Sequence, residues 1–169
     1  MNASSLLTGF WFFLGGFVFG SFLEYWGHRL LHQWRFIGKV HRNHHASGVG
    51  QGVLLEYIDY IKPLFPLMFP MFFVSLPAGI GWFLGTNAFA VFSAYSHQLQ
   101  HDNPQKCFWM PMPNHYVHHK LNMWHYNFGM ALDIWDRVFR TYKPVEEAKW
   151  REGLDPEMAK KSLLDIRWW

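Results

Sequence analysis

The chain has 169 residues and a formal net charge of +3, and it carries 11 histidines but a single cysteine, Cys107. Charged residues make up 16 % of the chain and aromatic residues 20 %, which excludes a disordered segment and a protein that coats nucleic acid. The lone cysteine excludes a disulfide framework and a cysteine-rich zinc module. Because the charged residues gather towards the C-terminus, we divide the chain into an apolar, histidine-bearing membrane domain (residues 1–144) and a charged tail (residues 145–169).

The first apolar segment predicts a membrane helix. Leu6–Leu23 contains no charged residue, and its 18 residues reach the lower length for crossing the hydrocarbon core of a bilayer. We place this span at about residues 5–25. Gly16 and Gly20 form a small-xxx-small pair, a spacing that lets a second helix approach closely.

The segment Gly52–Lys62 (GVLLEYIDYIK) has the pattern of a helix that lies in the membrane interface. In that position Tyr57 and Tyr60 would face the substrate. An ordinary packing helix explains the same pattern, and both interpretations stay open at this point.

A second uncharged run, Pro63–His101, is too long for a single span. It contains a turn signal at Pro77–Gly81 (PAGIG), so we predict a hairpin of two spanning helices at about Leu64–Leu76 and Ile80–Ser96. Lysine and arginine lie between the first span and the hairpin and again after the hairpin, whereas the N-terminal segment and the hairpin tip have none. The positive-inside rule therefore predicts a multi-pass protein with its histidine clusters on the cytoplasmic side.

Ten of the histidines form four short clusters with helical spacing. Residues at i, i+3 and i+4 fall within about 100° around a helix axis, so each cluster presents its imidazoles on one face, as metal chelation requires. The HxxxH clusters are His28/His32 and His97/His101, and the HxxHH clusters are His41/His44/His45 and His115/His118/His119.

The order HxxxH then HxxHH occurs twice, so each half of the chain supplies five imidazoles. Two octahedral ions with five nitrogens each would use all ten and leave open positions for dioxygen or water. Imidazole suits iron, copper, zinc and nickel, and open-site iron performs oxygen chemistry that redox-inactive zinc cannot. The eleventh histidine, His125, lies outside the clusters and is either a further ligand, a partner of a ligand or a structural residue.

The four clusters are followed by Asn127-Phe128-Gly129 and then by Trp135–Thr141 (WDRVFRT). This order resembles the fatty acid hydroxylase and sterol desaturase superfamily, whose members are integral-membrane, non-haem di-iron oxidases. The resemblance covers about Phe22 to Pro144, and the histidine pattern is its most specific part. The small carotenoid ring hydroxylases of similar size differ in the spacing of their first box and lack the Trp-Asp element.

The resemblance implies an all-α integral-membrane bundle with a cytoplasmic, histidine-rich helical cap that holds a dinuclear metal site. It implies that the ten clustered histidines bind two iron ions, for which zinc can substitute in a purified sample, and that Asn127 and Asp136 support the ligands. Dioxygen would be the co-substrate. Electrons would come from an external donor, a separate ferredoxin- or cytochrome-type redox partner.

The expected activity is a dioxygen-dependent lipid hydroxylase or desaturase that oxidises an unactivated C–H bond, with a fatty-acyl or related membrane lipid as substrate and no nucleic-acid partner. Sterol and carotenoid substrates within the same chemistry stay open. The alternative from another class is a histidine-rich metal transporter or buffer, which would place polar ligands inside the membrane. In the tail we expect a short helix at Pro156–Leu164 and an interfacial anchor at Arg167–Trp169.

Overall fold

The structure, a computed structural model, describes residues 2–34 and 36–169, and in that part of the chain the regular elements are all helical. The expectation of an all-α fold is confirmed. The α-helices are α1 (Ala3–Gln33), α2 (Gly38–Ser47), α3 (Val53–Leu64), α4 (Leu76–Asp102), α5 (Asn114–Lys120), α6 (Ile134–Val138) and α7 (Glu147–Arg151). Short 3-10 turns cover Phe65–Met68, Pro70–Phe73, Pro104–Lys106 and Pro156–Lys160.

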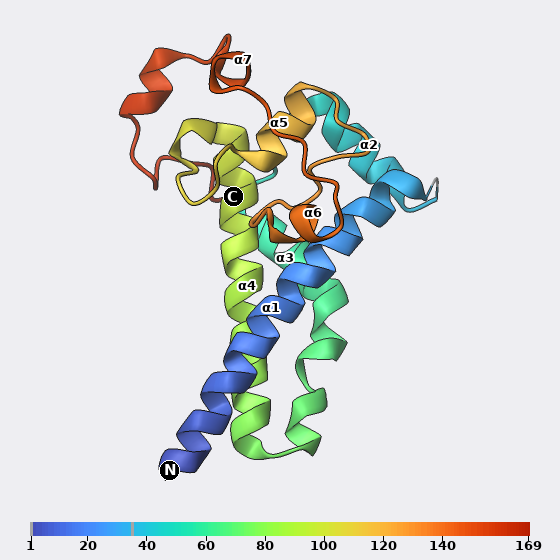
Figure 1. The fold of residues 1–169 in the computed structure, drawn as a ribbon, viewed down its shortest axis with the longest axis vertical. Coiled ribbons are helices and arrows are strands. Elements are labelled where there is room, and N and C mark those ends of the chain that lie inside the picture. Colours follow the sequence, from blue (N-terminus) through green and yellow to red (C-terminus); the bar gives the residue numbers. More distant parts are fainter. Residues whose placement is uncertain (1, 35) are drawn as a thin grey trace.

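Helices α1 and α4 run along the molecule, cross in close contact and diverge towards their C-terminal ends (Figure 1). Glycines make this close approach possible. A Cβ on Gly16 would lie 2.6 Å from the carbonyl oxygen of Trp82, and a Cβ on Gly85 would overlap the carbonyl oxygen of Phe13. The predicted role of Gly16 in helix approach is confirmed, and its partner helix is α4.

Helix α1 is the one helix in the described chain that is long and apolar enough to cross a membrane. Its side chains support that reading, because Leu6, Phe10 and Trp11 are each more than half exposed although they are large and apolar. Asn2 caps its first turn by accepting the backbone N–H of Ser5 at 2.9 Å. That the segments 64–76 and 80–96 also cross the membrane stays a prediction, separate from the secondary structure that each of them adopts.

The predicted helix over about Leu64–Leu76 is wrong, and so is the predicted turn at Pro77–Gly81. Helix α3 ends at Leu64, and the chain then descends through the two 3-10 turns Phe65–Met68 and Pro70–Phe73. Proline lacks an N–H and clashes with the preceding turn, so Pro66 and Pro70 break up the α-helix. Pro77 lies instead in the first turn of α4, where proline is favoured and where Ser75 caps the helix.

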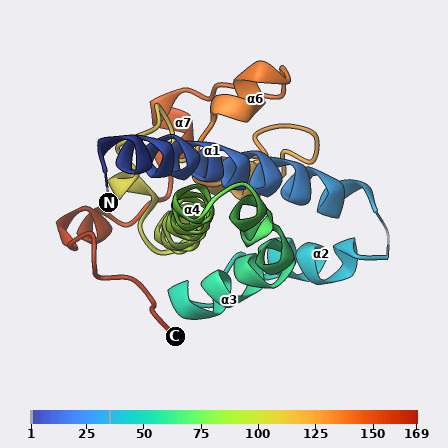
Figure 2. The ribbon, with the colours of Figure 1, turned by 90° about the horizontal axis from the view of Figure 1, so that it is seen from below.

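The descending arm still forms a hairpin with α4, as Figure 1 shows. It is made of α3 and the two 3-10 turns, and it lies beside α4, with α1 crossing α4 in the view from below (Figure 2). The histidine-bearing ends of α1 and α4 therefore meet α2 and α5 at one end of the molecule, opposite the hairpin tip.

The charged tail packs back onto this end. Trp150 is buried in a cluster with Met112 and Val117, and the backbone N–H of Val53 donates to the carbonyl oxygen of Arg167 at 3.2 Å. The helix expected at Pro156–Leu164 is instead a 3-10 turn over Pro156–Lys160.

We predict that Gly85→Ala destabilises the fold by about 1–3 kcal/mol, because the added methyl group must push α1 away from α4. Gly27→Ala is the matched control, since a Cβ at Gly27 meets nothing within 4 Å. Thermal unfolding of both variants in the same detergent measures the difference, and equal melting temperatures would contradict the packing described here.

Candidate metal centre

The ten clustered histidines come from four helices and lie together at one end of the α1–α4 pair. The C-terminal turns of α1 and α4 supply the HxxxH pairs, and the short helices α2 and α5 supply the HxxHH sets. Nine of these side chains form two adjacent groups, and the tenth, His97, lies beside the second. The first group is His28, His32, His41, His45 and His118, and the second is His44, His101, His115 and His119.

The nitrogens of the first group are closely packed. The Nε2 atom of His32 lies 2.9 Å from that of His41, 3.0 Å from that of His118 and 3.2 Å from those of His28 and His45. Five imidazole nitrogens thus converge on one small volume.

The second group has similar spacing. The Nε2 atom of His101 lies 3.2 Å from that of His44 and 3.1 Å from that of His115. His97 lies beside this group, with its Nε2 atom 3.3 Å from that of His44. The two groups touch, because the rings of His45 and His119 stack with their centroids 3.9 Å apart.

Each group takes one histidine from the other half of the sequence repeat. His44, the middle histidine of the first HxxHH set, joins the second group, and His118, the middle histidine of the other set, joins the first. On a helix the residues i and i+4 lie about 40° apart, whereas i+3 lies about 60° to the other side of i. This spread lets the middle imidazole of each set meet the neighbouring group once the four helices are brought together.

Hydrogen bonds fix the orientation of several rings. The Nδ1 atoms of His28, His118 and His101 lie 2.5, 2.7 and 3.1 Å from backbone carbonyl oxygens of Phe128, Tyr126 and Gly48. A carbonyl oxygen only accepts, so these Nδ1 atoms carry the proton. Because a neutral imidazole has one N–H, the Nε2 lone pairs of these rings point into the groups.

Burial keeps the imidazoles neutral. Desolvation, helped by repulsion from neighbouring histidines, lowers the pKa of His44 to about 4 and that of His45 to about 3. Desolvation likewise lowers the pKa of His118 to about 3, although its bond to the Tyr126 carbonyl opposes the shift. Neutral rings with lone pairs about 3 Å apart repel one another unless a cation lies between them.

The spacing fits a metal ion of high coordination number. At a metal–nitrogen distance of about 2.1 Å, neighbouring ligands lie about 3.0 Å apart in an octahedron and about 3.4 Å apart in a tetrahedron. The separations of neighbouring nitrogens within the two groups, from 2.9 to 3.2 Å, lie on average nearer the octahedral value. In addition, both ring nitrogens of His119 are buried without a hydrogen-bond partner within the described chain, as expected for a ligand without its metal.

Glu56 of α3, which sequence reasoning missed, contacts a histidine of the centre. One of its carboxylate oxygens lies 3.0 Å from Nδ1 of His97, and both side chains are buried. Burial acts to raise the pKa of Glu56, and the interaction with His97 outweighs it, so the pKa of this carboxyl is lowered. A carboxylate on the outer nitrogen of a metal-binding histidine orients the ring and raises its basicity.

Two buried carboxylates hold the four consecutive backbone N–H groups of residues 128–131. Asp136 accepts the first two at 2.8 and 2.6 Å, and Glu24 accepts the last two at 2.6 and 3.2 Å. Asn114 and Thr141 add side-chain hydrogen bonds to Asp136 at 3.0 and 2.7 Å. The segment is therefore clamped between α6 and α1.

The carbonyl groups of this segment in turn position the histidines. That of Phe128 accepts from His28, and that of Met130 accepts from the Gln100 amide at 2.6 Å. Gln100 accepts the backbone N–H of His115 at 2.8 Å. Asp136 and Glu24 thus connect to both groups through one stretch of backbone.

The other residues singled out from the sequence lie as follows. Asn127 has a positive φ of 60° and bonds both backbone polar groups of Lys143, at 3.0 and 2.8 Å. His125 is exposed and lies outside both groups. Tyr60 lines the cavity described next, whereas Tyr57 lies outside its wall and donates to Asn87 at 3.1 Å.

An apolar cavity of about 890 Å³ reaches the histidines from the side of α1, α2 and α3. Its apolar lining includes Leu23, Leu64 and Phe89. Its inner wall near the centre is formed by His28, His41, His44 and His97. This is the size and lining expected for a small-molecule site that accepts an apolar ligand.

Glu24 and Glu56 were the functional acids that the sequence could have revealed. Glu24 is the clearer case, because it is the first charged residue after a long apolar stretch and an ionisable residue in such a place is by default a functional candidate. Glu56 gave a weaker signal, since Asp59 and Lys62 follow it closely. Gln100 and Asn114 carried no comparable signal, because a lone amide is common anywhere in a sequence.

We predict that the metal-depleted protein loses stability as the pH falls below 6.5. The unfolded histidines take up protons near their ordinary pKa of 6.5, whereas the folded ones, with pKa values of about 3 to 4, do not. The free energy of unfolding is therefore highest above pH 6.5 and decreases as the pH is lowered from 6.5 towards about 4. Melting temperatures at pH 7.5, 6 and 5 measure this, and a flat profile would contradict the burial of neutral imidazoles.

We also predict that Asp136→Asn destabilises the protein by about 2–3 kcal/mol and weakens metal binding, because the amide cannot accept all four hydrogen bonds. Asp133→Asn is the matched control, since Asp133 pairs with a half-exposed Arg137 at 2.6 Å and such surface pairs contribute little. Chemical unfolding and metal titration should give clearly lower values of the unfolding free energy and the metal affinity for Asp136→Asn than for Asp133→Asn. Similar values for both variants would show that the hydrogen bonds of Asp136 to residues 128 and 129 contribute little to stability or metal binding.

Known proteins with sequences similar to this chain are lipid-oxidising enzymes by name. The family model for "Fatty acid hydroxylase" matches residues 13–141. An alkylglycerol monooxygenase from Xenopus tropicalis is 28% identical over 131 residues, which cover 75% of this chain and 29% of that protein. The alkylglycerol monooxygenase from Homo sapiens is 25% identical over 146 residues, which cover 81% and 32%. The chain thus spans less than a third of the length of these relatives, and no solved structure matches it. The chain belongs to the fatty acid hydroxylase family.

Proposed function

We propose that this chain is a membrane-bound, oxygen-dependent lipid hydroxylase that uses two iron ions. The observation that carries the proposal is the apolar cavity whose inner wall consists of histidines from the two groups. The first group would hold one ion, and the second group together with His97 would hold the other. When bound, the iron would supply the oxygen activation that amino-acid side chains cannot perform.

Residues of the chain itself orient the histidine rings for metal binding. His28, His101 and His118 keep their protons on Nδ1 and present lone pairs inward, so no proton has to leave before a cation binds. Glu56 places a carboxylate oxygen 3.0 Å from the outer nitrogen, Nδ1, of His97. Asp136 and Glu24 support this arrangement through the backbone of residues 128–131.

The cavity favours a chain-like apolar substrate. From His28 to Gly20, both in its wall, α1 advances eight residues, which is about 12 Å at 1.5 Å per residue. An alkyl or acyl chain can lie along this length with one carbon beside the histidines, while the apolar wall excludes water. Because the relatives are named for alkylglycerols and the family for fatty acids, we propose an acyl or alkyl lipid as substrate.

The net reaction sets what must enter the site. Hydroxylation of one C–H bond by dioxygen puts one oxygen atom into the product alcohol and the other into water, and it consumes two electrons and two protons. The chain would therefore need an external reductant. Desaturation of the same lipid consumes the same reductant but leaves no oxygen in the product.

We propose further that α1, the segment 64–76 and the segment 80–96 of α4 cross the membrane, with the histidines on the cytoplasmic side. The positive-inside pattern of Lys and Arg supports this orientation. The metal-transporter alternative is less well supported. Its ligands would line a path through the membrane, whereas these histidines gather in two groups at one end of the bundle.

We predict that His44→Ala and His118→Ala each lower bound iron and abolish dioxygen-dependent product formation, because each removes a nitrogen from its group. His125→Ala should leave the iron content unchanged, since His125 lies outside both groups. Iron analysis and lipid profiling under ¹⁸O-labelled dioxygen measure these effects. A product with one labelled oxygen identifies hydroxylation, and unchanged iron in the His44 and His118 variants would refute the assignment.

A further inference from the structure

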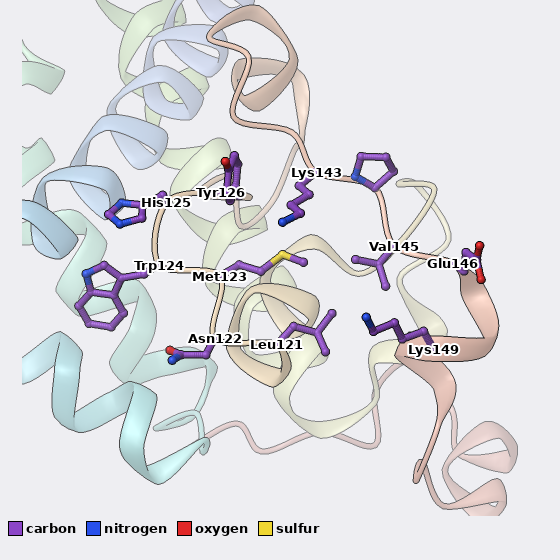
Figure 3. Close-up of a pocket in the computed structure, with 11 residues that line it drawn as sticks. Leu121, Asn122, Met123, Trp124, His125, Tyr126, Lys143, Val145, Glu146 and Lys149 are labelled. Carbon is purple, nitrogen blue, oxygen red and sulfur yellow. The ribbon is translucent and has the colours of Figure 1, made fainter.

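A second pocket, drawn in Figure 3, shares no lining residue with the apolar cavity. It has a volume of about 690 Å³ and is formed by the loop 121–126 and the segment 143–149. His125, which neither histidine group uses, lines it, and so does the partly exposed Trp124. The mechanism proposed above assigns no role to this pocket.

The pocket is connected directly to the first histidine group. The Trp124 ring lies edge-on to His32 with 4.4 Å between centroids, and it lies 5.4 Å from the ring of His45. The carbonyl oxygen of Tyr126, in the same loop, accepts from Nδ1 of His118 at 2.7 Å. The loop 121–126, with the indole of Trp124 on its histidine side (Figure 3), therefore separates the pocket from two histidines of the first group.

The charges in the pocket favour an anionic partner. Lys143 and Lys149 reach towards the open space from opposite sides, whereas the carboxylate of Glu146 is turned away from it (Figure 3). Within the part of the chain that the structure describes, neither lysine has a carboxylate at ion-pair distance. The Nζ atom of Lys143 lies 4.9 Å from the centre of the Tyr126 ring. Two exposed ammonium groups thus remain available to an acidic surface.

We infer that this pocket is the docking site for an acidic, one-electron carrier protein and that Trp124 is the point of closest approach for electrons. The inference rests on the proposed function, in which two electrons must come from outside for each hydroxylation. Electron tunnelling falls steeply with distance, so a carrier has to dock where the protein layer over the histidines is thin. Each encounter would oxidise the carrier by one electron, and two encounters supply the pair that reduces the second oxygen atom to water.

Binding of a purified carrier tests the docking surface without any turnover. The full chain is placed in nanodiscs of neutral phosphatidylcholine, and two acidic probes are titrated: a plant-type 2Fe–2S ferredoxin and the soluble domain of a small acidic cytochrome. We expect saturable binding of at least one probe that weakens with salt, and a Kd at least about tenfold higher for Lys143→Glu/Lys149→Glu. No binding of either probe at low salt would overturn the inference.

The matched control reverses the same number of charges elsewhere. Lys160→Glu/Lys161→Glu changes two exposed lysines of the tail and should leave the Kd within about twofold of the unmodified chain. If the control weakens binding as much as the pocket variant does, the effect reflects net charge, and the docking site is refuted.

Reduction kinetics test the role of Trp124. With the iron-loaded protein, Trp124→Leu should slow oxidation of the bound, reduced carrier, and Trp124→Phe should restore most of the rate, since it keeps an aromatic ring beside His32. Reduction by dithionite, which needs no docking, should be equal in all three proteins once their iron contents are matched. Equal carrier rates in the Leu and Phe variants would overturn the assignment.

The two proposals fail in different ways. If no lipid is oxidised with any reductant while the Lys143/Lys149 variant still loses carrier binding, the lipid hydroxylase function is wrong and the docking site stands. If dithionite supports lipid oxidation while the carrier binds equally well to the pocket variant and the unmodified chain, the function stands and the docking site is wrong.

Discussion

The crowding of neutral imidazoles is the constraint on which the rest of this structure depends. Their nitrogens approach to about 3 Å, and in rings such as His28 and His118 the lone pairs face inward. Such an arrangement is repulsive by itself, so it persists only if other interactions hold the four helices in place or a cation joins the nitrogens. The glycine-mediated contact of α1 with α4 and the clamped segment 128–131 supply that support.

The clamped segment explains why two acidic residues are kept in an apolar body. A buried carboxylate is costly unless several donors satisfy it, and Asp136 and Glu24 are each satisfied by backbone N–H groups and side-chain hydroxyls. Their hydrogen bonds fix a stretch of backbone whose carbonyls then orient His28 and Gln100. The position of a histidine ring on α1 is thus set by a carboxylate more than 100 residues away in the sequence.

The histidine groups have two unlike surroundings. On one side, His28, His41, His44 and His97 form a wall of an apolar cavity that opens between the helices. On the other side, His32 and His45 contact Trp124, whose loop forms one wall of a polar pocket that two lysines also line. An oxidase needs an apolar path for a lipid and a polar path for its reductant, and this arrangement keeps the two apart.

The sequence by itself determined the helical class, the apolar first helix and the ten histidines that meet, because helical periodicity and the HxxxH and HxxHH spacings are local properties of the chain. It suggested Asp136 and Asn127 only through the family resemblance. Prolines near residues 63–77 misled the placement of the hairpin, since the same residue that breaks a helix interior also begins one. Only the tertiary structure decided that His44 and His118 exchange groups, that Glu56 meets His97, and that Trp124 joins the histidines to a surface pocket. These contacts depend on how four helices are rotated and brought together, and no spacing within one segment records that rotation.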